Sequence, residues 1–171
     1  IVLVSKDEKI LGWIELSDKI RSNSLSSIKR LQQRGIDVIM LTGDRHEVAK
    51  SVSNTVGINT IFSELKPDEK AEQIRQLQKK GTVAMIGDGI NDAAALTIAD
   101  VGIAMGAGSE VALESADIVL VRDDLSDAVA SLDLGRSTMR KIRSNLVWAF
   151  MYNVIGIPLA MGVLFPWTGL L

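Results

Sequence analysis

The sequence has 171 residues, of which 23% are charged, with a formal net charge of -2 and no cysteine. This length suits one domain with a hydrophobic core, or one domain with an appendage, and excludes an assembly of several domains. Acidic and basic residues are interleaved, which argues against nucleic acid as a partner, and the lack of cysteine excludes disulfides and thiolate metal sites within this chain.

The first half of the chain predicts a hairpin followed by alternating helices and strands. Two apolar runs, "IVLVS" and "ILGWIEL", flank "KDEK" and predict the hairpin. The elements expected next are a helix over "SLSSIKRLQQRG" ended by Gly35, a buried strand at "DVIMLT", a helix over 45–56 ended by Gly57, a short strand near "TIFSE", and a helix from Pro67 to Lys80. The first residues resemble the middle of a strand, so we expect the chain to be a piece of a longer protein.

The second half continues the same alternation. The expected elements are a strand at "TVAMI", a helix over 91–99, a strand at "VGIAM", a helix from about Ser109, a strand at "DIVLV", and a helical run from about Leu125 through Arg143. Such alternation predicts an α/β domain with a parallel sheet, helices on both faces, and a site at the carboxyl ends of the strands.

Residues 144–171 contain no charged side chain, in contrast to the preceding sequence. The apolar stretch at 146–164 is long enough to cross a hydrocarbon core about 30 Å thick. Its flanks carry Arg136, Arg140, Lys141 and Arg143 on one side, with Trp148 and Trp167 near its two ends. The positive-inside rule and the aromatic belt predict a transmembrane segment over 144–171, entered from the cytoplasm, with residues 1–143 cytoplasmic. The alternative is a buried core helix of a larger soluble domain.

The stretch "MIGDGINDAAAL" places two carboxylates on either side of a glycine turn. Asp88 directly follows a predicted strand, and Asn91 and Asp92 begin the next helix. Two carboxylates about 4 Å apart at an effective dielectric near 20 repel by roughly 4 kcal/mol, so the motif predicts a cation between them. We expect Asp88 to bind Mg²⁺ directly and Asp92 to bind it or orient its waters. Taken alone, Asp92 could instead be a helix N-cap.

Two further groups of residues suit a phosphoryl ligand. Thr42, Gly43 and Asp44 follow the strand at 36–41, where a hydroxyl and backbone amides could hold a phosphoryl oxygen. Lys70, in the first turn of its helix, could neutralise charge that shifts during phosphoryl transfer. Singly, these residues also fit an ordinary strand-to-helix turn and a solvated lysine, but their order along the chain favours one shared site.

The order of "MLTGD", "KPDEK" and "MIGDGINDAAAL" resembles the second, third and fourth motifs of the haloacid-dehalogenase fold. Together with "ADVGIAMGAGSEVALESADIVL", the chain resembles the phosphorylation domain of P-type ATPases, and "NLVWAFMYN" with Pro158 is most similar to their heavy-metal, copper-transporting subfamily. The resemblance implies ATP and Mg²⁺ as cofactors, Asp88 and Asp92 as Mg²⁺ ligands, Asn91 and Lys70 as contacts of an aspartyl phosphate, and Thr42, Gly43 and Asp44 on the phosphate and nucleotide side.

The nucleophile of this family lies in an Asp-Lys-Thr-Gly-Thr stretch, and this chain contains none. The resemblance therefore implies that the nucleophilic aspartate lies upstream in a multi-pass membrane protein, with the actuator domain, most of the nucleotide-binding domain and six membrane helices. Residues 1–10 could hold the last strands of the nucleotide-binding region. We expect the chain alone not to turn over ATP.

Polar side chains within the apolar segment are costly and usually functional. The resemblance implies that Tyr152 and Asn153 contact the transported copper ion, with lipid around the segment; the alternative for this pair is hydrogen bonding between helices. Two other functions stay open for the chain: a soluble phosphatase of the same fold, and a non-catalytic fragment.

Overall fold

The computed structural model describes residues 2–7, 9–14, 19–87, 90–106, 114–164 and 169. The chain divides into two compact units, Ile1–Ser126 and Asp127–Leu171. The elements in chain order are β1 (Val2–Lys6), β2 (Lys9–Ile14), α1 (Ser24–Gln33), β3 (Ile39–Leu41), α2 (His46–Val56), β4 (Thr60–Phe62), α3 (Pro67–Gln78), β5 (Ala84–Gly87), a 3₁₀ turn (Ile90–Asp92), α4 (Ala93–Ile98), β6 (Val101–Ala104), β7 (Ile118–Val119) and α6 (Leu125–Ala160).

The strands of the described residues form three separate sheets. β1 and β2 make the predicted antiparallel hairpin, β3 pairs with β4 in parallel, and β5, β6 and β7 form a parallel sheet in that order. The predicted parallel direction is confirmed, but the single sheet is not. Among the described residues no ladder joins β3 to β5, so each of these strands has one edge without a strand partner.

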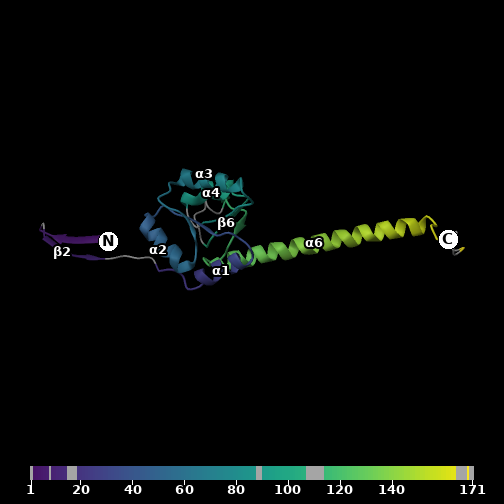
Figure 1. Cartoon of the computed structure of the whole chain (residues 1–171), viewed down its shortest axis with the longest axis horizontal. Coiled ribbons are helices and arrows are strands. Elements are labelled where there is room, and N and C mark those ends of the chain that lie inside the picture. Colours follow the sequence, from purple (N-terminus) through teal and green to yellow (C-terminus); the bar gives the residue numbers. More distant parts are fainter. Residues whose placement is uncertain are drawn as a thin grey trace. The chain divides into compact units, whose positions relative to one another are not determined.

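Helices cover both faces of β3 through two apolar clusters. The first cluster joins α3, β5 and α4, and Leu41 of β3 packs against it. The second contains Ile28 of α1 and Val56 of α2, and Met40 of β3 packs against it. Successive side chains of a strand point to opposite faces, so these two neighbours bury opposite sides of β3. Figure 1 shows α3 beside α4, in accord with the predicted layers of helix and sheet.

Two predicted helices differ from the structure or fall outside it. The helix expected over 91–99 begins as the 3₁₀ turn Ile90–Asp92 and continues as α4. The helix expected from about Ser109 begins within residues 107–113, which lie outside the described residues.

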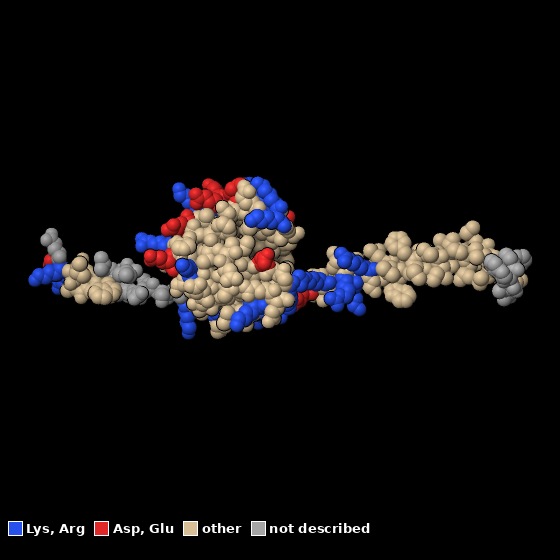
Figure 2. All heavy atoms as spheres, in the orientation of Figure 1, with Lys and Arg blue, Asp and Glu red and all other residues tan. Residues whose placement is uncertain are grey.

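The second unit consists mainly of α6, which ends at Ala160 and is followed by a turn over 161–164. In Figure 2 the Lys and Arg side chains along α6 end where an uncharged surface begins. Because α6 ends at Ala160, the apolar stretch predicted to span a membrane, 146–164, is helical only up to that residue. That part covers about 22 Å, against the roughly 30 Å of a hydrocarbon core. Within the described part of the chain no helix combines the length and apolar character needed to cross a bilayer, which corrects the predicted transmembrane helix.

Candidate functional site

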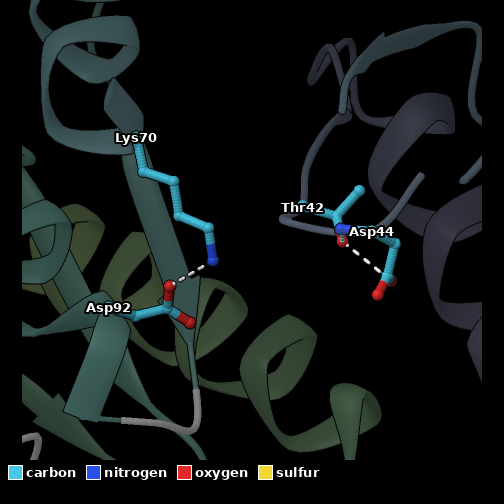
Figure 3. Close-up of polar contacts among 4 residues, drawn as sticks. All are labelled: Thr42, Asp44, Lys70 and Asp92. Carbon is cyan, nitrogen blue, oxygen red and sulfur yellow. Dashed lines mark hydrogen bonds and ion pairs between the residues drawn. The ribbon is translucent and has the colours of Figure 1, made fainter. Parts of the chain in front are cut away.

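An ion pair joins α3 to the turn that precedes α4. The Nζ atom of Lys70 lies 2.7 Å from Oδ1 of Asp92, and the two side chains are only 14% and 13% exposed. Figure 3 shows the lysine reaching from its helix toward this carboxylate. Charge-assisted hydrogen bonds are strong, and shelter from water reduces their screening. The structure thus brings together two predicted site residues that lie 22 positions apart.

The start of α3 places Lys70 at this position. Pro67 occupies the first turn, where its fixed backbone angle suits a helix and its missing N–H costs no hydrogen bond. Oε2 of Glu69 accepts a hydrogen bond from the Lys66 amide at 2.7 Å, which satisfies an N-terminal donor of the helix. Ile74 is buried one turn after Lys70, so the lysine emerges beside the first apolar cluster.

Asp92 stands where an N-cap residue would, but its side chain makes no capping hydrogen bond. Its carboxylate pairs with Lys70 instead, so the N-cap alternative does not describe this side chain. Asn91 is exposed in the same turn. Asp88 and Gly89 lie outside the described residues, and the pairing of Asp88 with Asp92 stays a prediction.

Gly87, the last residue of β5, makes room for Asp92. A Cβ atom at Gly87 would lie 2.9 Å from both Cβ and Oδ2 of Asp92, closer than real Cβ contacts. The sequence analysis did not single out this residue. The only sign in the sequence that Gly87 matters is its place directly before Asp88. Its contact with Asp92 arises from the fold of the turn, which residue order does not reveal.

A second pair of predicted residues closes the loop after β3. The hydroxyl of Thr42 donates to Oδ2 of Asp44 at 2.9 Å, and the Asp44 amide donates to the Thr42 oxygen at 3.1 Å. Figure 3 shows this contact as separate from the pair formed by Lys70 and Asp92. Gly43 between them is exposed, and a Cβ there would lie 3.2 Å from the Leu65 carbonyl oxygen.

The backbone connects this loop to the start of α3. The Leu65 amide donates to the Thr42 carbonyl at 3.1 Å, and the Glu64 amide donates to the Asp44 carbonyl at 2.9 Å. Glu64 has a φ of 59°, which is uncommon for a residue other than glycine. Because α3 begins two residues after Leu65, these bonds tie the loop at 42–44 to the helix that carries Lys70.

The described oxygen donors fit part of a Mg²⁺ site. Mg²⁺ is commonly held by one or two carboxylates together with substrate phosphates, and Asp92 supplies one carboxylate beside the amide of Asn91. The positive charge of Lys70 already balances that of Asp92. Among the described residues no group of three or more acidic or histidine side chains could hold a metal ion. The described residues therefore supply at most part of such a site.

Tyr152 and Asn153 are consecutive and exposed on α6. The side-chain amide of Asn153 donates to the Ala149 carbonyl at 3.1 Å, a bond within the helix. Tyr152 borders an apolar groove of about 340 Å³ with Trp148 and Met151. Copper binding by this pair stays a prediction.

The chain is similar to a known protein family and to proteins of known name. The family model described as a haloacid dehalogenase-like hydrolase matches residues 2–100. The copper-transporting ATPase HMA4 of Oryza sativa subsp. japonica is 52% identical over 99% of this chain, and copper-transporting ATPase 2 of Homo sapiens is 45% identical over 96% of it. The match covers 17% and 11% of those two proteins, so the chain spans a small part of their length.

A solved structure gives the same relationship at the level of the fold. The crystal structure of a zinc-transporting PIB-type ATPase in the E2.Pi state superimposes with a TM-score of 0.85 and 35% sequence identity. The match includes 94% of this chain and 26% of that one.

Proposed function

Since this chain belongs to the haloacid dehalogenase-like hydrolase family and matches heavy-metal P-type ATPases over nearly its whole length, we propose that it is part of an ATP-driven pump that forms an aspartyl phosphate and exports a heavy-metal cation. The favoured cation is Cu⁺, because the curated relatives described above are named copper-transporting ATPases. A soluble phosphatase is disfavoured because the 52% identical relative matches 99% of the chain, α6 included.

The sheltered pair of Lys70 and Asp92 carries this proposal. A lysine held by a carboxylate beside the ends of parallel strands is positioned in advance for a phosphoryl group. Lys70 and Asn91 would contact the phosphate, and Thr42, Gly43 and Asp44 would line the phosphate and nucleotide side. Asp88 and Asp92 would hold Mg²⁺, which supplies charge neutralisation for ATP and the attacking carboxylate.

The nucleophilic aspartate belongs, on this proposal, to a strand outside the chain. Within the described part of the chain, β3 and β5 each have an edge without a strand partner, and both strands lead into predicted site residues. One parallel strand between them would extend both ladders into a single sheet. Its carboxyl end would then reach the same edge as Thr42 and Asp88, where an attacking carboxylate is needed.

We place the boundary between the two functional parts of the chain between Arg143 and Ser144. Residues 1–143 would be the partial phosphorylation domain on the cytoplasmic side, and residues 144–171 would contact lipid and the membrane helices of the pump. Large apolar side chains exposed along α6 support this assignment, among them Leu146, Phe150, Val154 and Ile157. Tyr152 and Asn153 would contact the copper ion.

Metal-activated phosphorylation of the full-length protein tests the proposed function. We expect Cu⁺, and not Zn²⁺, to activate labelling of the protein by ATP. Asn153→Ala should weaken this activation but preserve labelling by inorganic phosphate, and Asn145→Ala on the same helix is the matched control. Activation by Zn²⁺ alone would contradict the copper assignment, and failure of ATP to label the wild type would contradict the pump.

A further inference from the structure

Arg21 and Asp123 form a contact between two distant parts of the first unit. One guanidinium nitrogen, Nη1, donates to the Asp123 carbonyl oxygen, and the other, Nη2, donates to its carboxylate. The residues lie 102 positions apart, one shortly before α1 and the other two residues before α6. Because Arg21 donates to a main-chain and a side-chain atom, it holds both the backbone and the carboxylate of Asp123.

The turn after β6 also approaches Asp123 closely. Gly106 has a φ of 63°, and a Cβ atom there would lie 2.9 Å from the Cβ of Asp123. The positive φ and the close approach both require glycine at this position. Asp123 therefore contacts both the guanidinium of Arg21 and the turn at Gly106.

The next three residues are fixed as well. Oδ1 of Asp124 accepts a hydrogen bond from the Ser126 amide at 2.7 Å, which satisfies a donor in the first turn of α6. Leu125 packs against the second apolar cluster, on which Met40 of β3 also packs. The strand that leads to Thr42 and the first residue of α6 thus share one cluster.

We propose that Arg21 and Asp123 are a positioning pair that holds the start of α6 to the catalytic unit and so couples phosphorylation to the transport step. The inference rests on the proposed function, since only a pump has transport to couple. Leu125 and Ser126, the first residues of α6, belong to the first unit, and the pair holds the residue two positions before Leu125. If the pair is removed, α6 loses part of this attachment while the phosphoryl site, built from other residues, remains.

The pair is suited to a coupling role because its loss should leave the fold intact. Both side chains are about half exposed, at 47% and 48%, and exposed ion pairs contribute little to global stability. A matched control exists within α3, where Arg75 and Glu72 form an ion pair of similar exposure, 56% and 52%.

The first test uses the full-length pump and compares Arg21→Gln, Asp123→Asn and the control Arg75→Gln. We expect all three variants to form phosphoenzyme from ATP at near-normal levels. The amount of metal transported per ATP hydrolysed should fall about fivefold or more in Arg21→Gln and Asp123→Asn, and not in Arg75→Gln. A normal transport ratio in Arg21→Gln would overturn the proposal. So would a parallel loss of phosphoenzyme and transport, because that indicates a merely structural role.

The second test uses the 171-residue chain and does not depend on pumping. Amide hydrogen exchange at Leu125 and Ser126 should be at least several-fold faster in Arg21→Gln than in the wild type or Arg75→Gln. Equal exchange in all three would show that the pair does not hold the start of α6. If exchange changes but the wild-type pump is never phosphorylated, the positioning contact stands and the proposed function fails.

Discussion

Lys70 and Asp92 neutralise each other across 2.7 Å in a place where each side chain is less than 15% exposed. Two charges that are largely withdrawn from water depend on one another more than a surface pair does. The lysine is therefore a structural partner of the turn before α4, and on the proposed function it is also the cation that would meet a phosphoryl group.

Removing only the lysine should destabilise the chain. Lys70→Met leaves the Asp92 carboxylate without its cation, and we expect a loss of about 1–3 kcal/mol in the free energy of unfolding. Denaturant unfolding of the chain measures this value. Lys79→Met, at the C-cap of the same helix, is the control, and Lys70→Met with Asp92→Asn should recover part of the loss. Equal stability of Lys70→Met and the wild type would contradict the importance of the pair.

Gly87→Ala should disturb the site without removing any charge. The new Cβ would overlap the Asp92 side chain, so that side chain must shift from the position in which it pairs with Lys70. We expect a destabilisation of about 1–3 kcal/mol and a loss of phosphoenzyme in the full-length protein. Gly81→Ala is the control, because a Cβ at Gly81 has no atom within 4 Å. Comparable stability and labelling of the two variants would argue against this steric role.

The pair of Arg21 and Asp123 should stabilise the chain in a pH-dependent way. The hydrogen bond from Arg21 holds the pKa of Asp123 below its ordinary value. A carboxyl with a lowered folded-state pKa contributes stability above its unfolded pKa, about 3.9, and loses it as the pH falls through the folded value. The pKa of Asp124 is also lowered, by its hydrogen bonds to Ser126. Asp124 is present in both the wild type and Asp123→Asn, so its contribution is common to the two proteins.

Unfolding of the wild type and Asp123→Asn between pH 7 and pH 3 measures this contribution. We expect a small advantage of the wild type that is constant down to about pH 4 and shrinks below it. An advantage that grows on acidification would contradict the lowered pKa.

Strand pairing between β3 and β5 can be tested by comparing two lengths of the protein. In the full-length pump, amides of β3 and β5 should exchange with solvent more slowly than in the 171-residue chain, because a strand between them supplies new hydrogen bonds. Amides of β6, which already has strands on both sides, should change least. Identical protection of β3 and β5 in the two proteins would contradict a strand in this position.

The sequence predicted those features that depend on local pattern. The apolar run before Thr42, Pro67 at the start of α3 and the hairpin at the N-terminus all follow from residue order and turn chemistry. The parallel direction of the strands follows from alternation with helices. Each of these predictions is confirmed by the structure.

Contacts between distant residues could not be predicted in this way. The pairing of Lys70 with Asp92 depends on how α3 packs against α4, and the contact of Arg21 with Asp123 depends on the path of the whole first unit. The membrane prediction relied on apolar length, on a basic flank and on tryptophans near the two ends of the segment. It could not foresee that α6 ends at Ala160, before the apolar stretch does.

The most direct test of the account is Mg²⁺-dependent labelling of the full-length protein by ATP, with and without Asp88→Ala. We predict an acid-stable phosphoenzyme in the wild type that requires Mg²⁺ and is absent in Asp88→Ala. Normal labelling of the variant, or labelling of the wild type without a divalent cation, would contradict the proposed joint role of Asp88, Asp92 and Lys70 in phosphoryl transfer.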